Sequence, residues 1–411
     1  MATEFRFWRA LICTMSFRVR LLACAALVAG SLAPATAWAE GSDPSFQPTD
    51  SRVDMFMYGR MGMGWTPGGQ VISGAYMNLG DRHAIGGRLE EGDYLEPGLR
   101  FHILKGNKDD DVKVDFVMDF EIWSNDGAIL SDLANDYKLL TIVPEQAYVQ
   151  AHNVFIKGLD IWLGSRLYRK NDVHIADYFY FNSLPGQGLG VMYKNLDTAI
   201  LVNTGSSPFF QADLNQGSMA PGVVPEVVKR IRTIFVAQYK YPFGHRSSYV
   251  QGLGEFHVVP RLQDAAHVAP NGLDPQDWGW VLGAKAHFDL GRDQFNDMSF
   301  RYGTRIANGA ASGRTTYDTF GDTALDGTYK GAYGIEVVDH FMWNVGHIFS
   351  LNGYGTLHYN RGALDYVPAA AAVGGPPPVV GPNTRLDFAV GARPVVYLHK
   401  MFQLMAEATY Q

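Results

Sequence analysis

The chain has 411 residues, 47% of them hydrophobic and 13% aromatic, and carries a formal net charge of −7 at pH 7. An acidic chain is a poor partner for nucleic acid or any other polyanion. After residue 40 no segment offers the ~18 continuous apolar residues of a membrane helix, so a form that spans a membrane would have to use strands.

The first 39 residues have the organisation of a secretory signal peptide. Arg18 and Arg20 precede an apolar run, and Ala37-Trp38-Ala39 supplies a cleavage site of the small-x-small type. This leader holds both cysteines, Cys13 and Cys24, so disulfides cannot staple the mature chain. We expect residues 1–39 to be removed and residues 40–411 to form one domain, because no linker divides them.

Apolar and polar residues alternate with a period of two in many parts of the mature chain. In residues 112–123 the apolar side chains fall on one face and the polar ones mainly on the other, and the same pattern recurs in residues 99–103, 385–393 and 402–411. Alternation in segments of about ten residues, separated by turn residues, is typical of outer-membrane strands. The sequence therefore predicts an all-β protein, a transmembrane antiparallel barrel, because only closed barrels satisfy the backbone of strands in lipid.

A soluble β-sandwich or propeller would also alternate. No blade repeat of roughly 40 to 50 residues is visible, however. One strand face also stacks Asp115, Asp119 and Glu121, as expected for a wet channel. Four segments rich in Gly, Pro, Asn, Ser and Asp are expected to be long loops outside the cell: Ser206 to Pro225, Leu262 to Asp277, Ala307 to Thr328 and Asp365 to Asn383.

The first predicted strand begins at Val53. Alternation places Asp54, Phe56, Tyr58 and Arg60 on one face, while methionines occupy the other. The polar face has to point to the channel, so Tyr58 and Arg60 should lie side by side within it.

The segment from Trp162 to Gly188 combines groups that suit neither a core strand nor a solvated loop. Basic residues, an Asp-Val-His triplet, a further Asp and four consecutive aromatics (178–181) precede a Pro-Gly-Gln-Gly turn. Aromatic faces beside paired polar groups are what a pyranose ring binds, by stacking and by hydrogen bonds to its hydroxyls.

This segment resembles the inward-folded third loop of the maltoporin and sucrose-porin family, which reads R-x-D-V-H-x-x-D-F-Y-Y-W-D. The first strand also resembles the family's Y-x-R-x-G-x-G-W-T run, and residues 93–96 resemble its Thr-Tyr-x-Glu. The resemblance implies that Tyr58 and Tyr94 belong to an aromatic slide for sugars. It implies that Arg60 and Glu96 belong to the adjacent polar track.

In the third loop the resemblance extends residue by residue, with three departures. Asp172, His174 and Asp177 match the pattern. Lys170 stands where maltoporins usually carry Arg and so lacks its planar fork. The departures and the matches together give the loop part of the expected sugar site: Lys170, Asp172, His174, Asp177, Phe179 (in place of Tyr) and Asn182 (in place of Asp).

The resemblance further implies an 18-stranded fold, a homotrimer and gradient-driven diffusion of oligosaccharides such as maltodextrins across a Gram-negative outer membrane. Neither a cofactor nor a metal is expected. The matching pattern stops before the family's last strands, so about 15 strands are expected here, with a gap or a forced closure beside the first one.

Two other functions compete with a sugar channel. A general porin, or a receptor barrel with long binding loops, would show the same strand pattern. An enzyme is disfavoured, because acidic pairs such as Asp119 and Glu121 are common on any wet strand face and no nucleophile motif accompanies them.

Overall fold

The computed structural model describes the chain in segments. These are residues 24–26, 52–60, 64–65, 71–72, 94–124, 140–168, 173, 175–176, 180–182, 184–206, 229–244, 247–261, 275–308, 324, 327–363, 384–399 and 402–410. Within them no helix is long and apolar enough to cross a membrane. Residues Arg305–Ala307 form a short 3-10 helix, η4.

The strands follow one another along the chain with few other elements. Their bounds are β1 (Cys24–Ala26), β2 (Val53–Arg60), β3 (Gly64–Trp65), β4 (Val71–Ile72), β5 (Tyr94–Leu104), β6 (Lys113–Ser124), β7 (Leu140–His152), β8 (Leu159–Tyr168), β9 (Leu184–Tyr193), β10 (Leu196–Ser206), β11 (Lys229–Pro242), β12 (Tyr249–Val259), β13 (Asp277–Gly291), β14 (Gln294–Thr304), β15 (Tyr333–Val345), β16 (Phe349–Arg361), β17 (Thr384–His399) and β18 (Phe402–Tyr410).

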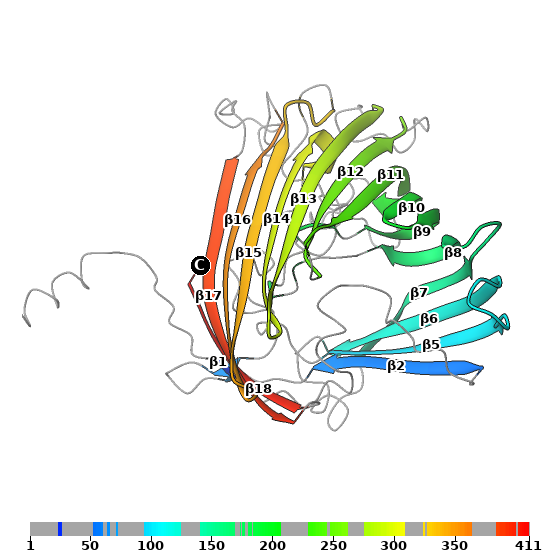
Figure 1. The fold of residues 1–411 in the computed structure, drawn as a ribbon. Helices are drawn as coiled ribbons and strands as arrows, with labels where there is room; N and C mark the ends of the chain where they lie inside the picture. The colour runs from blue at the N-terminus through cyan, green and yellow to red at the C-terminus, as the bar shows by residue number, and fades with distance from the viewer. Residues whose placement is uncertain are drawn as a thin grey trace, which may run out of the picture.

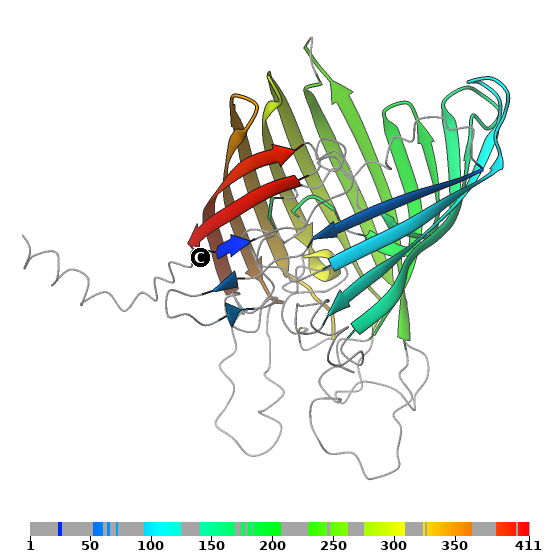
Figure 2. The same cartoon turned by 90° about the horizontal axis from the view of Figure 1, so that it is seen from below.

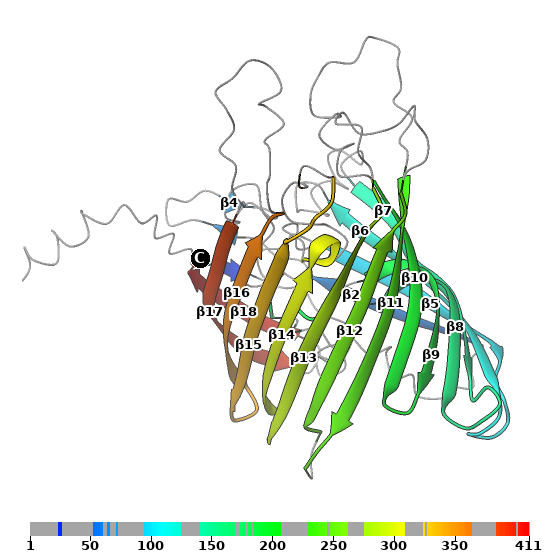
Figure 3. The ribbon, with the colours of Figure 1, turned by 90° about the horizontal axis from the view of Figure 1, so that it is seen from above.

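Fifteen of these strands, β2 and β5 to β18, lie in chain order in one antiparallel sheet, and the short β1 is added as a sixteenth strand beside β18. The sheet curves strongly (Figures 1 and 3), and β2 and β18 lie at the two ends of the curve (Figure 2). Among the described residues β2 pairs only with β5, while β18 pairs with β17 and with β1, which lies in the predicted leader. The all-β fold and the strand number are confirmed, and the expected gap beside the first strand is present.

Short and long connections alternate between the two rims of the sheet. The short ones are residues 105–112, 153–158, 194–195, 243–248, 292–293, 346–348 and 400–401. The tightest have backbone conformations suited to hairpins, as at Arg292 and Asp293, which both have a φ of 57°. Each of the four segments expected as long loops falls largely between two strands at the opposite rim.

The two faces of the sheet differ in the way that the sequence predicts. In β12 the buried face carries Gln251, Glu255 and His257, whereas Val250 and Phe256 on the other face are exposed. The outer face is apolar around the sheet, with Leu163, Leu282 and Leu386 all more than half exposed. Such a surface is stable only when lipid covers it.

Candidate functional site: the inner face of the barrel

Strands β2 and β5 bring Tyr58 and Tyr94 together on the inner face. The strand register pairs Tyr58 with Glu96, and Arg60 with Tyr94. The two tyrosine ring centroids lie 6.0 Å apart, and the ring planes are inclined by 56°. The Tyr94 hydroxyl lies within donating distance of Glu96 Oε2 (3.0 Å) and of Glu121 Oε1 (3.3 Å). The four described side chains of this tyrosine site are partly exposed, so a solute could touch both rings and carboxylates.

A group of three carboxylates lies beside this pair. Glu96, Asp119 and Glu145 bring oxygens within 4.8 Å of one another, and Gln146 Nε2 donates to Asp119 Oδ2 at 2.6 Å. A bulge between β6 and β7 lies at this point. Such a set of oxygens is of the kind that binds hard cations. The group cannot be predicted from the sequence, because its members come from three strands and meet at a bulge, which no local pattern shows.

The third loop folds back onto the inner wall, as expected. Val173, Ile175 and Tyr180 are at most 3% exposed and pack against Val338 of β15 and Tyr354 of β16. On the opposite side, Phe181 packs into an apolar cluster formed largely by inner-face side chains of β6 to β13. The loop is therefore held from both sides rather than projecting from the rim.

Two hydrogen bonds tie the backbone of this loop to distant strands. Ser299 of β14 donates to the carbonyl oxygen of Tyr180 at 3.1 Å, and Arg393 of β17 donates to that of Ile175 at 3.0 Å. Arg393 is itself oriented by Glu407, whose Oε2 lies 2.7 Å from the guanidinium Nε. Because Arg393 is charged and is held by Glu407, its hydrogen bond fixes the loop better than a hydrogen bond from a neutral donor would.

The loop residues expected to bind sugar are only partly described. Lys170, Asp172, His174, Asp177 and Phe179 lie outside the described residues, as does the side chain of Arg60. Asn182 is described and fully buried, so in this structure it lies behind the surface that a solute would touch. A sugar contact by Asn182 would require the loop to move, and it stays a prediction.

Behind the loop, β7 and β8 form an aromatic stack that the sequence analysis did not anticipate. Arg166 is 3% exposed, and its guanidinium lies 4.5 Å from the ring centroid of Tyr148 and 5.2 Å from that of Trp162. The Trp162 ring occupies the space over Gly190, where a Cβ would overlap it. Arg166 therefore supports the wall, since its charge is covered by aromatic faces.

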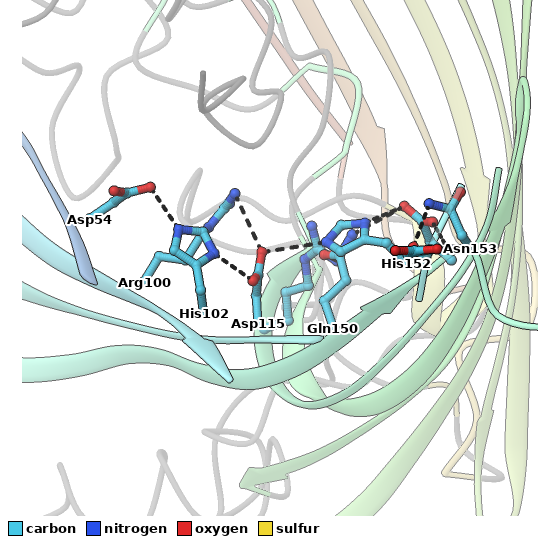
Figure 4. A network of polar contacts seen from close by, with 10 residues as sticks. Asp54, Arg100, His102, Asp115, Gln150, His152 and Asn153 are labelled. Carbon is cyan, nitrogen blue, oxygen red and sulfur yellow. Dashed lines mark hydrogen bonds and ion pairs between the residues drawn. The ribbon is translucent and has the colours of Figure 1, made fainter. Parts of the chain in front are cut away.

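Near the rim with the short turns, imidazoles and carboxylates alternate across five strands (Figure 4). His102 links Asp54 (2.9 Å) to Asp115 (2.8 Å). His152 in turn links Asp115 (3.5 Å) to Asp160 (2.8 Å). This chain of contacts joins β2, β5, β6, β7 and β8 where a solute would enter or leave on that side.

The inner faces of β12 to β16 carry a second polar network, and it is almost inaccessible. Arg301 lies 3.0 Å from Glu336 Oε2 and 3.7 Å from Glu255 Oε2. Glu255 also lies 2.8 Å from the His257 ring, and Glu336 lies 3.4 Å from that of His358. All five residues are at most 4% exposed.

An antiparallel sheet with an apolar outer face, a polar inner face and a loop anchored against the inner wall defines an outer-membrane porin. The family model described as LamB porin matches residues 53–411. The chain belongs to the LamB porin family, whose members are channels of the Gram-negative outer membrane and not enzymes.

Among solved structures, the chain is similar to Salmonella typhi OmpF in complex with daunomycin. The TM-score is 0.42 and the sequence identity 11%, over 87% of this chain and 97% of that one. A likeness so distant carries no property of that protein over to this one.

Proposed function

We propose that this porin is selective for oligosaccharides of the maltodextrin type, which diffuse down their gradient through its channel. The observation that carries the proposal is the tyrosine site, where two tilted rings stand beside the carboxylates of Glu96 and Glu121. Aromatic rings stack on the C–H face of a pyranose, and carboxylates accept hydrogen bonds from its hydroxyls.

The proposed sugar path runs from the tyrosine site to the third loop. Tyr58 and Tyr94 form the aromatic side of the path, and Arg60 and Glu96 form the polar side. The polar groups of Lys170, Asp172, His174, Asp177 and Asn182 and the Phe179 ring would bind the sugar at the loop. The loop's double anchorage on β14 and β17 supports this placement, because it keeps the segment in the channel.

Transport along such a path depends on contacts that are weak and repeated. A channel that binds its solute tightly blocks itself, so each contact must form and break quickly. Ring stacking together with exchangeable hydrogen bonds meets that requirement, because neighbouring positions offer similar contacts. We further propose that three such chains associate, each with its own pore.

Single-channel conductance in planar bilayers tests the proposal. The ion current of the purified protein is titrated with maltose, maltodextrins and sucrose, for the natural chain and for Tyr94→Ala. Tyr359→Ala, on the outer face of β16, is the matched control. We expect saturable block of the natural chain by maltodextrins. In Tyr94→Ala the sugar affinity should fall about fivefold, which corresponds to a loss of about 1 kcal/mol of binding free energy, and in the control it should be unchanged.

The alternative functions predict different single-channel currents in the presence of sugar. A general porin, or a receptor barrel with an incidental pore, would conduct ions without any saturable block by these sugars. That result would contradict sugar selectivity while leaving the porin fold intact. Closure of each inserted particle in three equal steps would support the proposed trimer.

A further inference from the structure

An open groove of about 480 Å³ runs over the outer face of β11, β12 and β13. Its outward-facing residues are Phe235, Ala237, Gly254, Phe256, Trp280 and Leu282. Phe235, Phe256 and Leu282 are each more than two fifths exposed. The groove is thus an apolar furrow on a surface that faces lipid.

Small residues on two adjacent strands, Ala237 of β11 and Gly254 of β12, make the floor of this groove. The register aligns Ala237 of β11 with Gly254 of β12, and Gly254 with Leu282 of β13. A Cβ built on Gly254 would meet no atom within 4 Å. Glycine weakens a strand interior and often marks a place where a ligand approaches the backbone. The space over Gly254 is therefore available to a molecule from the membrane.

A row of aromatic side chains borders the groove on the side of the long loops. The ring centroids of Trp280 and Tyr302 are 5.4 Å apart, those of Tyr302 and Tyr333 5.9 Å, and those of Tyr333 and Tyr359 5.8 Å. Such belts lie at the boundary between acyl chains and headgroups. Since long loops are extracellular, the groove opens into the outer leaflet.

Basic side chains gather just above this aromatic row. The Arg305 guanidinium lies 4.8 Å from the Trp278 ring centroid, and that of Arg361 lies 5.9 Å from the Tyr333 centroid. Arg261 and Lys330 are exposed at the same ends of the strands. Asp277 neutralises part of this charge by its ion pair with Arg305, but it is only 3% exposed. Among the residues that the structure describes at this rim, the exposed charges of Arg261 and Lys330 are positive.

We propose that this surface binds diphosphorylated lipid A, the anionic glycolipid anchor of lipopolysaccharide in the outer leaflet. One acyl chain fills the groove over Gly254, and the phosphates meet Arg305 and Arg361. Arginine is suited to phosphate because its fork donates two parallel hydrogen bonds. Arg305, over Trp278 of β13, and Arg361, on β16 further along the same rim, provide basic groups on the headgroup side of the furrow, as an amphiphile with an anionic head requires.

A second copy of this chain is a weaker candidate for the same surface. By strand alternation, the one acidic residue among the described outer-face side chains of the sheet is Asp339. It lies midway along β15 and accepts a hydrogen bond from Asn296 at 2.6 Å. The described outer face therefore offers little negative charge to complement the basic rim, whereas lipid phosphates supply it.

Native mass spectrometry in mild detergent, with synthetic diphosphoryl lipid A added, tests this proposal. Gly254→Leu should fill the groove without a clash in the chain. Gly353→Leu, an outer-face glycine of β16 with equally open space, is the matched control. We expect lipid A binding to the natural chain and to the control, and at least tenfold weaker binding to Gly254→Leu.

The headgroup part of the proposal is tested with Arg361→Gln and with monophosphoryl lipid A and phosphatidylethanolamine as further probes. We expect the natural chain to prefer the diphosphoryl form, and Arg361→Gln to lose most of that preference. Unchanged lipid A binding in Gly254→Leu would overturn the proposal. Weakened subunit association in that variant, without loss of lipid, would assign the groove to a partner chain instead.

Discussion

Two parts of the inner face carry similar residues and differ in access. The open wall, formed by β2, β5 and β6, keeps Tyr58, Tyr94 and Glu121 partly exposed. On the covered wall, formed by β12 to β17, the residues Glu255, Arg301 and Glu336 are each at most 4% exposed. Two hydrogen bonds tie the third loop to the covered wall.

The difference teaches that a polar inner face can serve two purposes in one barrel. On the open wall, the tyrosine site with the carboxylates of Glu96 and Glu121 is partly exposed and can exchange partners with a solute. On the covered wall, opposite charges are paired with one another in a low-dielectric setting, where removing one partner costs more than the pair contributes. Substitutions of the paired charges on the covered wall should therefore act mainly on stability, and substitutions at the tyrosine site mainly on transport.

The largest effect is expected from Arg301→Ala on the covered wall. Glu336 and Glu255 would remain buried without their guanidinium, at a cost of about 3–5 kcal/mol. Guanidinium chloride unfolding of protein refolded into lipid vesicles measures this loss. Replacing both partners, as Arg301→Met with Glu336→Leu, should recover much of it, and a single variant as stable as the natural chain would contradict the assignment.

An intermediate effect is expected from Arg393→Gln, which releases the third loop from β17. Losing a charged hydrogen bond to Ile175 should cost about 2 kcal/mol and widen the channel. Single-channel conductance should rise, and sugar block should weaken. Arg385→Gln is the control on the same strand, because Arg385 pairs with Asp387 rather than with the loop. Equal conductance in the two variants would show that the tether does not set the channel width.

A smaller effect is expected from His102→Ala on the open wall. Asp54 and Asp115, both buried, would lose the imidazole between them. Arg100 and His152 would remain beside Asp115, so the cost should be about 1 kcal/mol. The deficit should shrink as salt screens the two carboxylates. Unfolding at low and high salt measures it, with His347→Ala in an exposed turn as reference. A deficit that grows with salt would argue against carboxylate repulsion.

The smallest effect is expected from Tyr94→Phe, which removes one hydroxyl and keeps the ring. Stability should change by less than about 1 kcal/mol, because the site is open to water. Maltodextrin block should weaken less than in Tyr94→Ala if stacking dominates binding. Block that is equally weak in both variants would transfer the main role to the hydroxyl and its carboxylate partners.

Much of the architecture could be predicted from the sequence because alternation is a local property. Asp54 and Tyr58 face inward while Met55 is 81% exposed on the other face, as the period of two requires. The inward path of the third loop followed from the family resemblance, whereas its composition predicted sugar binding and not a direction. The tyrosine site also followed, since β2 and β5 place its members in register.

The division between the open and the covered wall could not be predicted in this way. Glu121 and Glu336 both occupy polar positions of alternating strands, and only the docked loop and the neighbouring strands decide which is accessible. The family resemblance predicts Asn182 as a sugar-binding residue, whereas its side chain is buried in the structure. The carboxylate group of Glu96, Asp119 and Glu145 depends on a bulge, a two-against-one mismatch that a single strand does not reveal.

The two anchors of the third loop also bear on the order of folding. Strand pairs in the sheet join near neighbours in the chain, through turns as short as two residues, whereas the anchors join residues 119 and 218 positions apart. Closing long loops is entropically slower than closing hairpins. The third loop should therefore dock last, after β17 has joined the sheet. During refolding into vesicles, we expect permeability to rise as barrels insert and then to fall as each loop docks.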